Sequence, residues 1–181
     1  KEPSLRPVPN NNPLHLVTTQ GQVHIHTSTF RGSFSIVLSE ALRSAGLGSK
    51  VLISQFLKGG VNQGPHGAVN LCGRLEWLRP AIETCLPGEL PEENLSFKKK
   101  HEEKAIKEIW EFCKKRLIEK KLDKIVLDEI GMAISLGFIE ETDLISMINN
   151  RPSSTDIILT GQSIPPKVIE MADQITELRC N

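Results

Sequence analysis

The stretch Lys-Ile-Val-Leu-Asp-Glu-Ile at residues 124–130 decides the fold. Its short apolar centre lies between Lys124 and Asp128, a pattern typical of a strand that is buried on both faces inside a parallel sheet. The apolar run stops at two adjacent carboxylates, Asp128 and Glu129. In an open α/β sheet the carboxyl ends of the strands line the ligand crevice, so we expect both side chains at its mouth.

Two interpretations of this acidic pair remain open. Asp128 and Glu129 are metal-ligand candidates, because two carboxylates at a strand end can hold Mg²⁺ or orient a water beside a phosphate. Alternatively, they cap the following helix and pair with nearby lysines, since acidic residues also favour helix starts. The spacing alone does not decide between the two.

Strands and helices alternate along the rest of the chain. Apolar or alternating runs predict further strands at residues 23–27, 50–56, 156–161 and 174–178. Helical spacing predicts helices at 36–45, 98–121 and 140–150, and another that starts at Pro165 and Pro166. This order indicates an α/β fold, a mostly parallel sheet with helices on both faces.

The domain organisation follows from composition. Residues 1–20 are rich in Pro and Asn, which predicts an extended or disordered N-terminal arm, and residues 21–181 then form a single α/β domain. Residues 61–97 show no clear periodicity. A long irregular insertion of this kind either determines substrate specificity or is a mobile loop.

Charge and cysteine content exclude several classes of partner. Lys and Arg number 22, as do Asp and Glu, so nothing favours nucleic acid or an anionic membrane as a partner. No apolar run approaches the roughly 20 residues of a membrane span, and the N-terminus shows no secretory signal. The four cysteines form no C-x-x-C pair, which predicts reduced, buried thiols in a cytoplasmic protein (Cys72, Cys85, Cys113 and Cys180).

The loop after the first strand occupies the place of a phosphate-binding P-loop but lacks its residues. A P-loop needs glycines, a Lys for the β- and γ-phosphates, and a Ser or Thr for Mg²⁺. Here the loop reads Ser-Thr-Phe-Arg-Gly-Ser-Phe-Ser at residues 28–35, so Gly32 remains, Ser33 replaces the Lys and Phe34 replaces the Thr. These losses weaken MgATP binding by about 10²–10⁴-fold.

Five residues remain candidates for binding a nucleotide or another anion. Arg31 supplies positive charge to the loop, and hydroxyls and a helix N-terminus also attract anions. After the second strand, Lys58 can reach a phosphate, although an exposed loop lysine is the interpretation we favour. The candidates are Arg31, Gly32, Ser33, Ser35 and Lys58.

Several motifs in the same order resemble the bacterial ATP:corrinoid (cob(I)alamin) adenosyltransferases, RecA-like P-loop enzymes. They are Gln-Phe-Leu-Lys-Gly at 55–59, Val-Leu-Asp-Glu at 126–129, Asn-Asn-Arg-Pro at 149–152, Ile-Ile-Leu-Thr-Gly at 157–161 and Thr-Glu-Leu-Arg at 176–179. The resemblance runs from about Val23 to Arg179. It implies a homodimer that transfers the 5′-deoxyadenosyl group of ATP to a Co(I) corrinoid, with Mg²⁺ organised by a P-loop Thr and the acidic pair.

The chain departs from this family at the substrate contacts. The degenerate Walker A loop, Gln162 in place of an Arg, and the lack of an aromatic segment between Cys85 and Leu95 all affect binding, while the buried strands match. We therefore favour a non-catalytic relative, a pseudoenzyme without assigned catalytic residues, that binds a nucleotide, another anion or a protein partner. The alternative is an active enzyme in which Arg31 and Lys58 compensate, with Mg²⁺ and ATP as cofactors and a corrinoid as substrate.

Overall fold

The computed structural model describes residues 20–31, 34–60, 63–83, 85–86, 96–119 and 122–179, with the backbone alone for 96–99. The expected N-terminal arm and two of the anion-binding candidates, Gly32 and Ser33, lie outside these residues. Within the described part of the chain, no helix is both long and apolar enough to cross a membrane.

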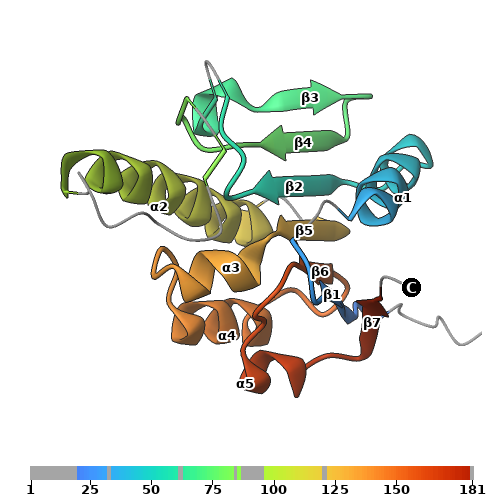
Figure 1. Cartoon of the computed structure of the whole chain (residues 1–181). Helices are drawn as coiled ribbons and strands as arrows, with labels where there is room; N and C mark the ends of the chain where they lie inside the picture. Colours follow the sequence, from blue (N-terminus) through green and yellow to red (C-terminus); the bar gives the residue numbers. More distant parts are fainter. Residues whose placement is uncertain are drawn as a thin grey trace, which may run out of the picture.

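A seven-stranded sheet forms the centre of the molecule (Figure 1). The strand order is β3-β4-β2-β5-β6-β1-β7, and every neighbouring pair is parallel except β3 and β4. The strands are β1 Val23–Ser28, β2 Val51–Gln55, β3 Val69–Leu71, β4 Leu75–Leu78, β5 Lys124–Asp128, β6 Asp156–Thr160 and β7 Gln174–Leu178. The predicted α/β fold with a mostly parallel sheet, the class to which RecA-like P-loop proteins belong, is therefore confirmed.

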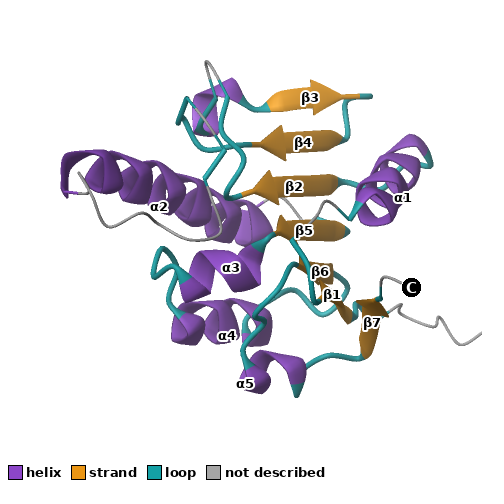
Figure 2. Cartoon of the chain, viewed as in Figure 1, coloured by secondary structure: helices purple, strands orange, loops and turns teal. Residues whose placement is uncertain are grey.

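Helices cover both faces of this sheet (Figure 2). Helix α1 packs on one face over β2, β5 and β6, and the other helices pack on the opposite face in a larger apolar cluster. The helices are α1 Ser35–Gly46, α2 Ser96–Glu119, α3 Ile130–Ser135, α4 Glu141–Asn149 and α5 Pro166–Ile169, and one 3₁₀ turn, η1, spans Pro65–Gly67.

Residues 124–128 form β5, which lies between β2 and β6 in the middle of the sheet. Four of its five residues are buried, because α1 covers one face of the strand and α2 and α3 cover the other. All five residues of β2 are buried for the same reason. Continuous apolar runs are what such doubly covered parallel strands require.

The described part of the insertion at residues 61–97 contains a turn and a hairpin that the sequence pattern did not predict. Residues 65–78 form η1 and the antiparallel hairpin of β3 and β4, which ends the sheet on one side. All three residues of β3 are exposed, so this strand carries no buried periodicity. The prediction of buried thiols was also partly wrong, because Cys113 is buried whereas Cys72 and Cys85 are exposed.

Candidate functional site at the carboxyl ends of the strands

Polar side chains lie next to one another where four neighbouring strands end. The strand register pairs Gln55 with Asp128 and His26 with Thr160. Extending the register of β5 and β6 by one residue places Asp128 opposite Thr160. On β2, β5 and β6 the residues two positions earlier, Ile53, Val126 and Ile158, pack in the apolar cluster under α1. Because side chains alternate along a strand, these four polar residues point to the α1 face. We call Gln55, Asp128, Thr160 and His26 the strand-end row.

Asp128 is the hub of this row. Its carboxylate is fully buried and accepts hydrogen bonds from Thr160 Oγ1 at 2.7 Å, Gln55 Nε2 at 2.8 Å and Lys58 Nζ at 2.9 Å. A buried carboxylate is tolerated only when it is paired and hydrogen-bonded in this way. The contacts hold β2, β5 and β6 together at their carboxyl ends.

Glu129 follows with a left-handed backbone, φ 58° and ψ 29°. Its N–H donates to Thr160 Oγ1 at 3.1 Å, and Arg31 Nε lies 2.7 Å from its Oε1. The side chain is 5% exposed, and no group among the described residues hydrogen-bonds to the buried Oε2. Such a strained backbone at a strand end is typical of functional sites.

Part of the second interpretation of the acidic pair is seen in the structure, because both carboxylates pair with nearby cations. Glu129 occupies the N-cap position of α3, but its side chain makes no capping hydrogen bond there. Instead Asp128 pairs with Lys58 and Glu129 with Arg31. The favoured interpretation of Lys58 as an exposed loop lysine was wrong, since its side chain is only 21% exposed.

A second branch of hydrogen bonds leaves the strand-end row towards the hairpin. Gln55 Oε1 accepts from Trp77 Nε1 and from Arg79 Nε, both at 2.9 Å. The Gln55 side-chain amide therefore connects β4 and the residue just beyond it to Asp128. None of Gln55, Trp77, Arg79 and Thr160 was among the site residues predicted from the sequence.

Comparisons with known proteins identify the family of this chain. Residues 19–181 match the family model described as ATP:corrinoid adenosyltransferase BtuR/CobO/CobP. The chain belongs to this family. A protein of Escherichia coli K12 named corrinoid adenosyltransferase is 26% identical to this chain over 160 residues. A protein of Salmonella typhimurium LT2 named corrinoid adenosyltransferase CobA is 27% identical, also over 160 residues. Each match covers 88% of this chain and 77% of the relative. An uncharacterized protein of Nostoc sp., all2391, is 26% identical over 174 residues, 88% of this chain but 44% of that protein.

Phe34, just before α1, belongs to the core. It is 2% exposed and packs in the apolar cluster under α1. Its ring meets His26 edge-on, with 6.4 Å between ring centroids. Ser35 is exposed at the first position of α1, whose N-terminus has no side-chain cap. Gln162, just beyond β6, donates from Nε2 to the carbonyl of Thr29 at 2.9 Å.

His26 on β1 completes the row. Burial and, to a smaller extent, the neighbouring charge of His24 lower the pKa of His26 below its usual value. Its buried Nδ1 has no hydrogen-bond partner among the described residues. The register with Thr160 places His26 in the strand-end row, with β6 between it and Asp128.

The described residues do not fit a preformed Mg²⁺ site. No three His, Cys, Asp or Glu side chains gather closely enough within the described ranges to hold a metal ion. Both oxygens of Asp128 already accept hydrogen bonds, and one oxygen of Glu129 faces Arg31. Glu129 Oε2 alone among these four oxygens has no donor in the described part of the chain.

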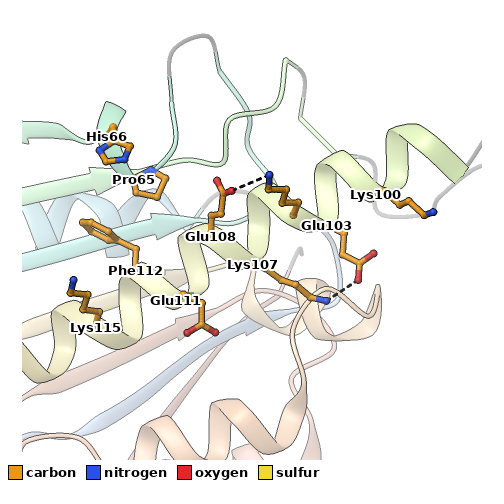
Figure 3. Close-up of a pocket in the computed structure, with 10 residues that line it drawn as sticks. Pro65, His66, Lys100, Glu103, Lys107, Glu108, Glu111, Phe112 and Lys115 are labelled. Atoms are coloured by element: carbon orange, nitrogen blue, oxygen red, sulfur yellow. Dashed lines mark hydrogen bonds and ion pairs between the residues drawn. The ribbon is translucent and has the colours of Figure 1, made fainter.

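A large cavity lies elsewhere, along the surface of α2 next to η1 (Figure 3). It has a volume of about 820 Å³ and contains no residue of the strand-end row. Lys and Glu alternate along its wall, and Lys107 pairs with Glu103 at 2.9 Å as Lys104 does with Glu108 at 4.0 Å. Because these charges largely cancel, the cavity shows no preference for a charged ligand.

Proposed function

We propose that this chain is a non-catalytic member of the ATP:corrinoid adenosyltransferase family that acts by binding, either a nucleotide or another anion, or a protein partner. One observation carries the proposal. Arg31, the sole cation in the sequence of the loop at residues 29–34, turns its guanidinium onto Glu129 rather than towards the start of α1.

The pairing of Arg31 with Glu129 weakens both phosphate binding by Arg31 and metal binding by Glu129. A guanidinium held 2.7 Å from a carboxylate is partly neutralised and binds phosphate less strongly. The same contact occupies an oxygen that a metal ion would need. Asp128 is in the same condition, because Lys58 Nζ lies 2.9 Å from its Oδ2.

The buried Phe34 supports the same conclusion. Its side chain has no oxygen to offer a metal ion, and its burial under α1 makes it part of the core. Recovery of a metal ligand here would require both a new residue and a repacked cluster around Phe34. The acidic pair keeps a structural use, because Asp128 joins three strands through its hydrogen bonds.

A specific observation also favours the second candidate, an active corrinoid adenosyltransferase with ATP as cosubstrate and Mg²⁺ as cofactor. Glu129 Oε2 is buried, has no partner among the described residues, and lies next to a strained backbone. A buried acceptor without a donor costs about 1–3 kcal/mol, and a bound cation removes that cost. In this candidate Arg31 and Lys58 would turn to the triphosphate.

Calorimetric titration with MgATP, with and without a reduced corrinoid, tests the proposal when adenosylcobalamin formation is assayed in the same samples. We expect no adenosylcobalamin in any sample, whether or not MgATP binds. Micromolar binding with product formation would overturn the proposal and establish the second candidate.

Two arginine variants sharpen this experiment. Arg31→Gln removes the candidate phosphate ligand, and Arg43→Gln is its matched control, because Arg43 pairs with Glu40 on the exposed surface of α1. We expect both variants to behave like the parent protein towards MgATP. In an active enzyme, Arg31→Gln alone would reduce binding by about tenfold or more.

Further expectations concern partners and location. The family resemblance implies a homodimer, and light scattering on the purified protein should give twice the chain mass of 20.1 kDa. We also propose a cytoplasmic location, with neither a membrane nor nucleic acid as partner. Fractionation of cells that express the protein tests that part.

A further inference from the structure

A small cavity lies on the hairpin, next to the branch of hydrogen bonds that leaves the strand-end row. Its volume is about 280 Å³, and it is lined by Gln63, Val69, Leu71, Trp77 and Arg79. Val69 pairs with Trp77, and Leu71 pairs with Leu75, which packs under α1. The cavity therefore opens on the α1 face of the sheet, beyond the part that α1 covers.

The apolar wall of this cavity is not covered by the described part of the chain. Val69 is 46% exposed and Leu71 is 36% exposed, although both point to the face that is buried elsewhere in the sheet. Side chains of this kind beside an aromatic ring form the apolar part of many small-molecule sites.

Two side chains of the cavity are held in fixed orientations. Trp77 Nε1 and Arg79 Nε both donate to Gln55 Oε1, and Gln55 is itself only 2% exposed and bonded to Asp128. The guanidinium of Arg79 lies over the Trp77 ring, 5.8 Å from its centroid. Binding to groups that are already ordered loses little conformational entropy.

The chemistry of these side chains specifies the class of ligand. A Trp ring and a guanidinium plane both stack on flat aromatic rings. Within the described residues, the hydrogen bond of Arg79 to Gln55 uses Nε alone, so its terminal nitrogens can pair with an anionic group. The Gln63 amide offers both a donor and an acceptor to ring heteroatoms. A cavity of about 280 Å³ is at the small end for ligand sites, which suits one ring system rather than a macrocycle.

We propose that this hairpin cavity binds a planar heteroaromatic ring that carries an anionic group, the class to which mononucleotides belong. The ring stacks against Trp77 and Arg79, and the anion pairs with the guanidinium of Arg79. This goes beyond the proposed function, because it requires neither the loop between β1 and α1 nor the acidic pair.

Fluorescence of Trp77 provides the first test. The chain contains two tryptophans, so Trp110→Phe leaves Trp77 as the only fluorescent one. The probes are AMP, which has both ring and anion, adenosine, which lacks the anion, and inorganic phosphate, which lacks the ring. We expect AMP to quench Trp77 saturably and to bind at least about tenfold more tightly than either fragment. Absence of saturable quenching by millimolar AMP, in this variant and by calorimetry in the parent protein, would overturn the proposal.

Two variants of the hairpin test where AMP binds. Arg79→Gln should weaken AMP binding by about tenfold or more, whereas Arg74→Gln, at the exposed turn of the same hairpin, should leave it unchanged. Val69→Asp places a negative charge in the cavity from an exposed position, so it should also weaken AMP binding without unfolding the protein. Circular dichroism checks the fold of each variant.

The outcomes separate this inference from the proposed function. AMP binding that is equal in the parent, Arg79→Gln and Val69→Asp proteins would place the ligand elsewhere and overturn the inference. Adenosylcobalamin formation would overturn the proposed function and leave the hairpin cavity untouched. Absence of product together with Arg79-dependent AMP binding supports both.

Discussion

Thr160 shows how one hydroxyl can hold a strained strand end. Its Oγ1 donates to Asp128 Oδ1 at 2.7 Å and accepts from the Glu129 N–H at 3.1 Å. Thr160→Val keeps the shape of the side chain but leaves two buried groups without partners. We expect a loss of about 2–4 kcal/mol in the free energy of unfolding, measured by urea denaturation.

Thr155→Val is the matched control for this prediction. Thr155 is equally buried, but its Oγ1 makes one hydrogen bond, to the carbonyl of Leu122 at 2.6 Å. The expected loss is about 1 kcal/mol. Equal losses in the two variants would contradict the bridging role of Thr160.

His26 should make stability depend on pH. Because burial and then the charge of His24 lower its pKa in the folded protein, the unfolded chain takes up the proton first as the pH falls. The stability that this residue contributes is complete above the usual value of 6.5 and is lost as the pH falls through the lower folded value. His26→Phe keeps an aromatic ring against Phe34, so its urea midpoint should fall less than that of the parent between about pH 7.5 and about pH 5.5.

The exposed His66 provides the control for this comparison. His66→Gln should follow the parent protein over the same pH range. A His26→Phe protein that loses stability on acidification as steeply as the parent would show that other groups cause the loss.

At the scale of the elements, hydrogen bonds to the Asp143 carboxylate join α2 to α4. Asp143 Oδ2 on α4 accepts from Trp110 Nε1 at 2.6 Å and from Lys114 Nζ at 2.7 Å on α2. Burial raises the pKa of Asp143, but the hydrogen bonds from Lys114 and Trp110 outweigh it and the net pKa lies below the usual 3.8. A depressed pKa stabilises the fold above the unfolded value and ceases to do so as the pH falls below it.

We therefore expect Asp143→Asn to destabilise the protein at neutral pH and to approach the parent below about pH 4. Urea unfolding at both pH values measures this difference. Glu141→Gln, in the same turn of α4, should differ little from the parent at either pH. A difference between parent and Asp143→Asn that is independent of pH would mean that packing, rather than charge, holds the two helices.

For the molecule as a whole, stability should decrease from the centre of the sheet to its edges. Strands β2 and β5 are buried throughout or nearly so, whereas β3 is fully exposed and β7 has four exposed residues of five. Hydrogen exchange should therefore be slowest in β2, β5 and β6 and fastest in β3 and β7. Equal protection of β7 and β5 would contradict this order, and would indicate that another segment or another copy covers that edge.

The spacing of apolar residues along the chain determined what the sequence could predict. Strands β1, β2, β5, β6 and β7 follow from apolar runs and the alternation with helices, and Asp128 and Glu129 follow from their place after a buried run. Strand β3 did not follow, since three exposed residues carry no periodicity. The pairing of Arg31 with Glu129 depends on the backbone path of a loop, and the double hydrogen bond of Thr160 depends on strand register. Neither is encoded in the spacing of residue types.

The close approach of Gly161 to the backbone of Glu129 restricts how this sequence can evolve. Gly161 has φ 119°, and a Cβ there would lie 3.0 Å from Glu129 Cα. A side chain at position 161 would therefore meet the backbone of Glu129, in addition to the strain of this φ. Substitution of Gly161 requires the backbone at Glu129 to move, which couples the evolution of the residue after β6 to that of the strand end after β5.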